Sequence, residues 1–224
     1  MQRLSLVLFA VALVSSSAHA ENIDLAPVKK WIEAQQKVKS ISATFNQERE
    51  LRSLKRPLKN SGKFSYQAPS SFRWEIGEPG EPPKSVAVQN AGKGIVIAEP
   101  HKKKAKTYTM EEVQKEGKAR GFSFLDAGFP RSFEAFDENF QVTEVEHGHG
   151  TITFRAEPRA RKAKLVLRHV KFTINQQNQE LDQLYLRFRD GSNITTKFHN
   201  TKRNASLPSG TFDFDLSGYE VEKG

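Results

Sequence analysis

The sequence predicts a mainly β protein in which a strongly curved antiparallel sheet has helices on one side. Most of the chain alternates apolar and polar residues with a period of two, which is the pattern of half-buried strands. Short turns separate the alternating segments, as they do in hairpins. Helical patterns are confined to the N-terminal part and to one interval in the middle of the chain. Consecutive hairpins favour an antiparallel meander over a parallel sheet.

Residues 1–20 have the three parts of a secretory signal peptide. Arg3 gives a positive start, residues 4–14 are apolar, and Ala18-His19-Ala20 is a cleavage site of the small-x-small type. We therefore expect cleavage near Ala20 and a single domain over residues 21–224. No later stretch has the length of an apolar membrane span, so we expect the exported protein to have no helical anchor.

The composition limits the possible classes of function. The 224 residues include no Cys, which excludes disulfides, cysteine-based catalysis and the thiol on which a bacterial lipoprotein is acylated. The 16 Phe and 2 Trp can fill a core without disulfides. The formal net charge is +9, with basic clusters at residues 101–106 and 159–164. These clusters favour solvated loops, or docking to anionic lipid or an acidic partner, over nucleic-acid binding.

The first elements after the signal are a helix and a strand. Asp24 is a suitable N-terminal cap and Pro27 suits a first turn, which predicts a helix to about Ser40. From Ile41 the period changes to two, which predicts a strand that continues to about Leu51.

Two aromatic strands follow directly. Phe64 and Tyr66 share one side of the segment 62–69, and Phe72 and Trp74 share one side of the next segment. An aromatic sheet surface must be covered by another element or filled by a bound molecule. The sequence therefore predicts an aromatic inner surface on this pair of strands.

The centre of the chain is predicted to hold three short strands and then a helical interval, at residues 85–89, 94–98, 106–109 and 111–140. Within this interval, residues 121–130 are strongly apolar and are bracketed by Gly and Pro, and Phe133 and Phe136 recur at helical spacing. Short aromatic helices at this place either form a lid over the sheet or cap an ordinary core.

Alternation returns after Phe140 and continues almost to the end of the chain. Strands are predicted at residues 141–146, 151–157, 165–174, 181–189, 193–200 and 211–215. Strands thus outnumber helices throughout, and the sequence shows no internal repeat or long linker that would divide it into domains.

The sequence contains none of the common catalytic signatures. It has no nucleophile elbow, no zinc-protease motif, no phosphate-binding glycine loop and no dinucleotide fingerprint, so we expect no enzymatic activity and no cofactor. His147 and His149 could place two imidazoles together, but glycines flank them and no carboxylate completes a metal site, which favours a polar turn. Asp213 and Asp215 are interpreted as the polar side of a terminal strand.

The order of several weak motifs resembles the LolA family of periplasmic carriers of outer-membrane lipoproteins. These motifs extend over essentially the whole exported chain: the N-terminal helix, Ile41 to Gln47, Ser61 to Phe64, Pro69 with Phe72-Arg73-Trp74, Gly92-Lys93, Thr211 to Phe214, and Gly218 to Val221. The resemblance implies an incomplete, strongly curved antiparallel β-barrel that is covered by a helical lid and encloses a hydrophobic cavity.

The resemblance also implies a function and partners. Family members take acylated lipoproteins from an ATP-driven transporter of the inner membrane and deliver them to an outer-membrane receptor that is itself a lipoprotein. The missing cysteine favours the carrier over the receptor, and a carrier that hands on its cargo is expected to be a periplasmic monomer. We expect acyl chains to contact a sheet wall and a lid formed by Phe45, Phe64, Tyr66, Phe72, Trp74, Phe122, Phe124 and Leu125.

One position departs from the family pattern. Many carriers have a basic residue immediately before the proline of the second sheet strand, where it is thought to hold the lid shut, and this chain has Ala68 there. The departure leaves open a carrier or sensor of another lipid or glycolipid on the same fold. A third possibility is an envelope interaction protein that uses its basic loops and has a filled core.

Overall fold

The structure, a computed structural model, describes residues 23–113, 130 and 132–224. Its strands are β1 (Ser40–Glu50), β2 (Leu58–Gln67), β3 (Ser71–Ile76), β4 (Ser85–Asn90), β5 (Gly94–Glu99), β6 (Lys104–Tyr108), β7 (Phe140–His147), β8 (Thr151–Pro158), β9 (Leu167–Asn175), β10 (Leu181–Phe188), β11 (Asn193–Arg203) and β12 (Glu220–Lys223). The helices are α1 (Ala26–Gln36), α3 (Phe133–Asn139) and α4 (Arg161–Lys164), with a 3-10 turn, η1, at Pro100–Lys102.

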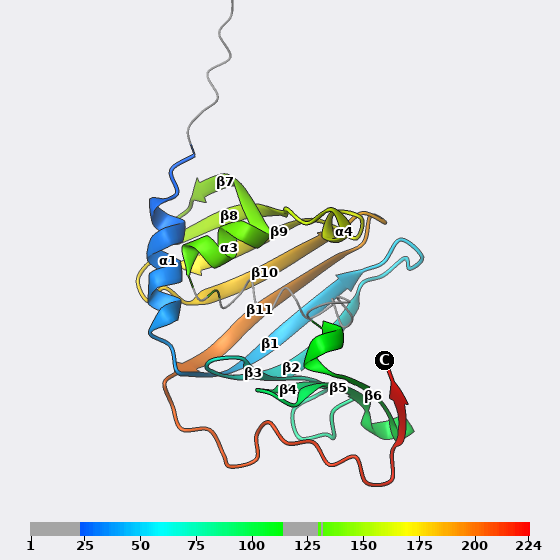
Figure 1. Cartoon of the computed structure of the whole chain (residues 1–224). Coiled ribbons are helices and arrows are strands. Elements are labelled where there is room, and N and C mark those ends of the chain that lie inside the picture. Colours follow the sequence, from blue (N-terminus) through cyan, green and yellow to red (C-terminus); the bar gives the residue numbers. More distant parts are fainter. Residues whose placement is uncertain (1–22, 114–129, 131) are drawn as a thin grey trace, which may run out of the picture.

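These strands form one 12-stranded sheet in the order β12-β6-β5-β4-β3-β2-β1-β11-β10-β9-β8-β7. All neighbours are antiparallel except β12 and β6, which are parallel. Figure 1 shows the sheet curling so that β4 to β6 and β7 to β9 lie at opposite ends of the view, with α1 and α3 on its inner side. The predicted fold class, a curved and mainly antiparallel sheet with helices on one side, is confirmed.

The helical end of the sheet has its own apolar cluster. Trp31 of α1 packs against the rings of Phe154 and Phe172, at centroid distances of 5.4 and 5.6 Å. Phe136 of α3 meets the same two rings at 6.1 and 6.0 Å. All four side chains are essentially inaccessible to solvent, so this cluster fixes both helices on β8 and β9.

The N-terminal helix begins and ends close to the predicted positions. Asp24 accepts a hydrogen bond of 2.9 Å from the backbone N–H of Ala26, which satisfies one of the free donors at the start of the helix. The helix ends at Gln36, and its last turn closes with a bond of 3.0 Å from the N–H of Val38 to the carbonyl of Gln35. It is therefore four residues shorter than the prediction that placed its end at Ser40.

The prediction of a strand at residues 211–215 was wrong. The backbone carbonyls of Thr211 and Asp213 instead accept hydrogen bonds of 3.3 and 3.1 Å from the Arg73 guanidinium. The Cζ atom of the same guanidinium lies 5.9 Å from the centroid of the Phe214 ring. The segment crosses the face of the sheet opposite the aromatic side and leads to β12, which the sequence did not predict. Strand β12 pairs in parallel with β6, beyond the segment that Arg73 contacts.

Within the described ranges, no helix is both long enough and apolar enough to cross a membrane.

Candidate functional site

Four aromatic rings form the inner wall of the sheet at β1, β2, β3 and β11. Phe45 and Trp74 are closest, with ring centroids 4.3 Å apart, and Phe64 lies 5.5 Å from Trp74. Phe198 of β11 meets all three rings edge-on at 6.1 to 6.3 Å. Such tilted and edge-on contacts are the preferred arrangements of aromatic pairs. The wall is a packed cluster of rings on the concave side.

Strand register and one glycine explain why these rings meet. Phe64 lies opposite Ala43 on β1 and opposite Trp74 on β3, so the two rings share one face of the sheet. Phe45 lies opposite Gly62, where a Cβ atom would overlap the Cζ atom of the Phe45 ring. The absence of a side chain at Gly62 therefore gives the Phe45 ring the space in which it reaches Trp74.

Phe72 and Tyr66 extend the wall toward the β2–β3 turn. They are opposite each other in the sheet; Phe72 is buried and Tyr66 is partly buried against the same cluster. The Tyr66 hydroxyl donates a hydrogen bond of 3.3 Å to the carbonyl of Pro69, which follows a cis peptide bond from Ala68. The structure thus brings together Phe45, Phe64, Tyr66, Phe72 and Trp74, the five sheet residues proposed from the sequence.

The lid residues of that prediction, Phe122, Phe124 and Leu125, lie outside the described residues.

A small apolar hollow lies where this aromatic cluster meets the helical cluster. It has a volume of about 20 Å³ and is lined by Gln35, Ile41, Ala43, Phe64, Leu181, Phe198, Thr201 and Arg203. Leu181 belongs to the helical cluster, Phe64 belongs to the aromatic cluster, and Phe198 packs against both. Such a volume holds about one water molecule. A larger molecule can therefore enter here only if the two clusters separate along this seam.

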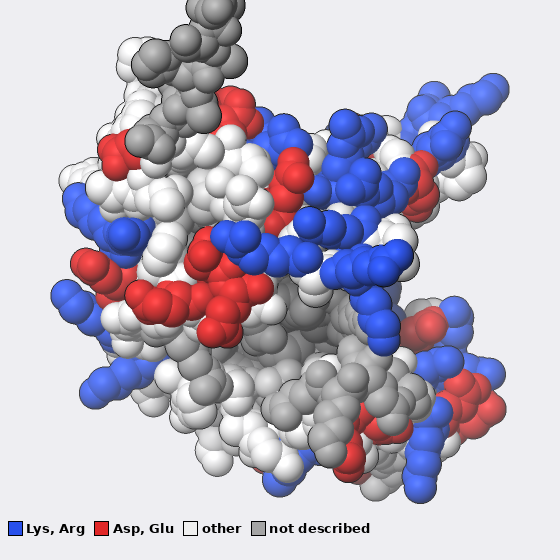
Figure 2. Space-filling model, turned by 45° about the horizontal axis from the view of Figure 1, so that its top comes forward, with Lys and Arg blue, Asp and Glu red and all other residues white. Residues whose placement is uncertain are grey.

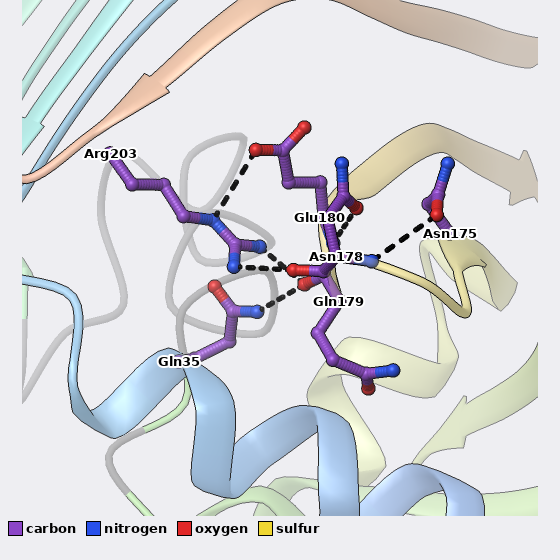
Figure 3. A network of polar contacts seen from close by, with 6 residues as sticks. All are labelled: Gln35, Asn175, Asn178, Gln179, Glu180 and Arg203. Atoms are coloured by element: carbon purple, nitrogen blue, oxygen red, sulfur yellow. Dashed lines mark hydrogen bonds and ion pairs between the residues drawn. The ribbon is translucent and has the colours of Figure 1, made fainter.

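One end of the hollow is polar and is organised by Arg203. Its guanidinium donates a hydrogen bond of 2.9 Å to the carbonyl of Asn178 and another to the carbonyl of Gln179, and it lies 3.9 Å from the Glu180 carboxylate (Figure 3). The Gln35 amide of α1 donates to the same Gln179 carbonyl at 3.0 Å. This network, which we call the Arg203 network, joins β11, α1 and the β9–β10 turn at the seam.

Burial governs the electrostatics of this end. The Arg203 side chain is 18% exposed and that of Glu180 is 25% exposed, so both charges are largely removed from water. Desolvation lowers the pKa of Arg203, and the Glu180 carboxylate opposes that shift. The hollow therefore combines apolar walls with a sheltered cation, an arrangement that suits an amphiphilic molecule better than a plain hydrocarbon.

Several residues of the site were not predicted from the sequence. Phe198 lies on a predicted strand, and its inward position could have been inferred because Ile194, Thr196 and Phe198 alternate on one face of that strand. Arg203 has no such signal, because an irregularity of β11 at Asn200, where φ is 52°, shifts the alternation between Phe198 and Arg203. A search for inward alternation on every strand would have found Phe198 and not Arg203.

In the described part of the chain, no group of three or more His, Cys, Asp or Glu side chains is arranged so that it could hold a metal ion. His147 is the last residue of β7, one position beyond the predicted end of that strand, and His149 is in the following turn, as the sequence predicted.

The fold and the site define a class of proteins in which a curled antiparallel sheet presents an apolar inner face under helices. The chain belongs to the LolA family, described as outer membrane lipoprotein carrier protein LolA, whose family model matches residues 36–215. The family consists of periplasmic carriers that bind their cargo without catalysing a reaction.

Solved structures have the same fold at low sequence identity. An uncharacterized conserved protein from Thermus thermophilus is 9% identical, with 88% of this chain and 99% of that chain covered and a TM-score of 0.52. A putative outer membrane lipoprotein-sorting protein domain from Vibrio parahaemolyticus is 8% identical, with coverages of 84% and 95% and a TM-score of 0.50. A comparison with curated proteins found no match.

Proposed function

We propose that this protein is a periplasmic chaperone that binds the acyl chains of lipoproteins and carries them between the two membranes. In this proposal residues 1–20 are a signal peptide and residues 21–224 are the exported carrier. It receives cargo from an ATP-driven transporter of the inner membrane and delivers it to an outer-membrane receptor. The observation that carries the proposal is the seam at Phe198, where the aromatic wall and the helical cluster meet around an apolar hollow.

The physical task is to keep an acyl chain away from water and still release it. Each methylene withdrawn from water contributes about 0.8 kcal/mol, so a chain of sixteen carbons requires on the order of 12 kcal/mol of burial. Aromatic and aliphatic walls supply this without directional contacts, and they accept chains of different lengths. Because the hollow has a volume of about 20 Å³, binding must widen the seam, and the cost of that opening lowers the net affinity and favours release.

The proposal can be tested with a substitution that fills space between the two clusters and introduces no buried charge. Thr201 lines the hollow, whereas Thr195 lies on the other face of the same strand. We expect Thr201→Phe to weaken binding of a fluorescent hydrophobic dye and its displacement by a diacylated lipopeptide, because the added ring is larger than the hollow and takes up space along the seam that an acyl chain would need. The matched variant Thr195→Phe should bind as the unmodified protein does. Equal binding by both variants, with both folded by circular dichroism, would contradict the proposal.

A carrier of another lipid on the same fold is the second candidate. Two observations favour it: Ala68 stands where many family members have a basic residue, and Arg203 provides a sheltered cation at the hollow instead. Mass spectrometry of molecules that co-purify with the protein separates the two candidates. Acylated lipoprotein supports the first, and free lipid or glycolipid supports the second.

A further inference from the structure

Exposed apolar side chains gather at one end of the sheet, away from the hollow. Among the described residues, six large apolar side chains are exposed, and four of them lie at this end: Leu54, Leu165 and Val166 in the connections, and Leu58 at the start of β2. Leu165 is 74% exposed and Val166 is 56% exposed, the two highest values of the six. Single exposed apolar residues need no explanation, but four that cluster at one end mark a surface for interaction.

Three connections form this end of the molecule, and they touch one another. They are the β1–β2 turn (residues 51–57), the β8–β9 connection with α4 (residues 159–166) and the β10–β11 turn (residues 189–192). The backbone N–H of Arg189 donates to the Val166 carbonyl at 2.8 Å, and its Nε donates to the Lys164 carbonyl at 3.0 Å. A methyl group on Gly191 would lie 3.0 Å from the Cδ atom of Arg52.

The same connections are strongly basic. We call them the basic rim, and apart from Arg159 their cations are Arg52, Lys55, Arg56, Arg161, Lys162, Lys164 and Arg189. Within the described chain none of these seven forms an ion pair, whereas the neighbouring Arg159 is paired with Asp137 at 2.7 Å. Asp190 lies among them, but its carboxylate accepts two hydrogen bonds from Ser192. Figure 2 shows Lys and Arg gathered on the side of the molecule where α4 and the β1–β2 turn lie.

We propose that the basic rim docks on an anionic lipid surface, with Leu165 and Val166 inserted at the headgroup level. Unpaired cations attract a negatively charged bilayer, and exposed aliphatic side chains among them gain by leaving water at the boundary of the acyl region. An acidic protein surface would match the charges, but it would leave the two most exposed apolar side chains unexplained. The combination of both features favours a lipid surface over a protein partner.

The position of the rim makes this docking independent of the proposed carrier function. Strand β10 begins at Leu181, which lines the hollow, and ends at Phe188, beside the rim; β11 runs back from Asn193 to Arg203. The rim and the hollow therefore occupy opposite ends of the same two strands. Variants of the rim leave the walls of the hollow unchanged, so the two proposals can fail separately.

The experiment measures co-flotation of the purified protein with vesicles of phosphatidylcholine alone or mixed with phosphatidylglycerol. We expect binding to the mixed vesicles that weakens as salt rises, because exposed charges are screened. The triple variant R161Q/K162Q/K164Q should lose on the order of 100-fold in affinity, about fivefold for each cation. The double variant L165S/V166S should lose about tenfold, since a buried aliphatic side chain is worth that much or more.

A matched control changes the net charge equally at a distant place. Lys30, Lys37 and Lys39 are exposed in and after α1, and K30Q/K37Q/K39Q should bind the mixed vesicles as the unmodified protein does. Absence of binding to the mixed vesicles would overturn the proposal, as would equal losses in the control and rim variants. Binding to polyglutamate without binding to vesicles would assign the rim to an acidic protein partner and would also overturn it.

Discussion

The Arg203 network predicts a measurable coupling between two residues that are far apart in the sequence. Gln35 and Arg203 both donate to the carbonyl of Gln179, which is partly buried. Gln35→Leu alone leaves that carbonyl with its Arg203 donor, so we expect a loss of about 1 kcal/mol in the free energy of unfolding. Arg203→Met alone keeps the Gln35 donor and frees the exposed carbonyl of Asn178 to bind water, which should cost about 2 kcal/mol.

The double variant removes both donors and leaves a partly buried carbonyl unpaired. An unsatisfied buried acceptor costs about 1 to 3 kcal/mol beyond the bonds lost, so the double variant should lose about 1 to 2 kcal/mol more than the sum of the single variants. The assay is urea unfolding followed by the fluorescence of Trp31 and Trp74, which report on the helical and aromatic clusters respectively.

A control pair shows whether the coupling is specific. Gln89 donates a hydrogen bond of 2.7 Å to the carbonyl of Ser70, which Arg203 does not contact. Arg203→Met combined with Gln89→Leu should therefore be additive within about 0.5 kcal/mol. The reasoning is refuted if Gln35→Leu and Arg203→Met are also additive within that margin, because the shared acceptor would then have no energetic role.

Three further predictions follow from the packing, the titration and the edge of the sheet. Gly62→Ala should cost about 1 to 3 kcal/mol in urea unfolding and disturb the Phe45–Trp74 contact, since its Cβ would overlap the Phe45 ring; an unchanged midpoint would contradict this. Burial, with Arg155 and Lys171 nearby, lowers the pKa of His169 from its ordinary value of 6.5, so the unfolded state takes up the proton first. The stabilisation from neutral His169 is then complete above about pH 6.5 and is lost as pH falls toward the folded-state pKa. The melting temperature of the unmodified protein should fall more between pH 7 and pH 5 than that of His169→Gln, and parallel curves would argue against it. Deletion of residues 217–224 removes the strand on β6 and should increase self-association in light scattering, whereas a protein that stays monomeric would show that the β6 edge is harmless.

The strands were predictable where alternation in the sequence corresponds directly to burial. Phe45, Phe64 and Trp74 alternate with polar residues and are 1%, 1% and 5% exposed, so the pattern located both the strands and the aromatic wall. This part of the site depends on local sequence together with the pairing of consecutive strands, and both leave a signal of period two.

The rest of the site depends on contacts that the local pattern does not encode. Phe214 and its neighbours alternate like a strand, but the Arg73 guanidinium takes up the backbone carbonyls that a partner strand would need. Strand β12 is exposed on every residue and all of its residues except Val221 are charged, and it pairs in parallel with a strand more than a hundred positions earlier. The position of Arg203 beside Gln179 likewise follows from the way that β11 returns to the β9–β10 turn.

The edge of β6 is unpaired in a newly made chain until β12 has docked on it. Residues 220–223 are synthesised after all the other strands of the described sheet, so until they dock, β6 has a row of unpaired amides and carbonyls that any nearby extended chain can bind. Once β12 has paired with β6, these amides and carbonyls are hydrogen-bonded. The charged residues Glu220, Glu222 and Lys223 of β12 are then exposed to solvent, which disfavours pairing with the strand of a second molecule. A newly synthesised molecule is therefore most prone to associate with its neighbours in the interval before its own β12 has paired with β6.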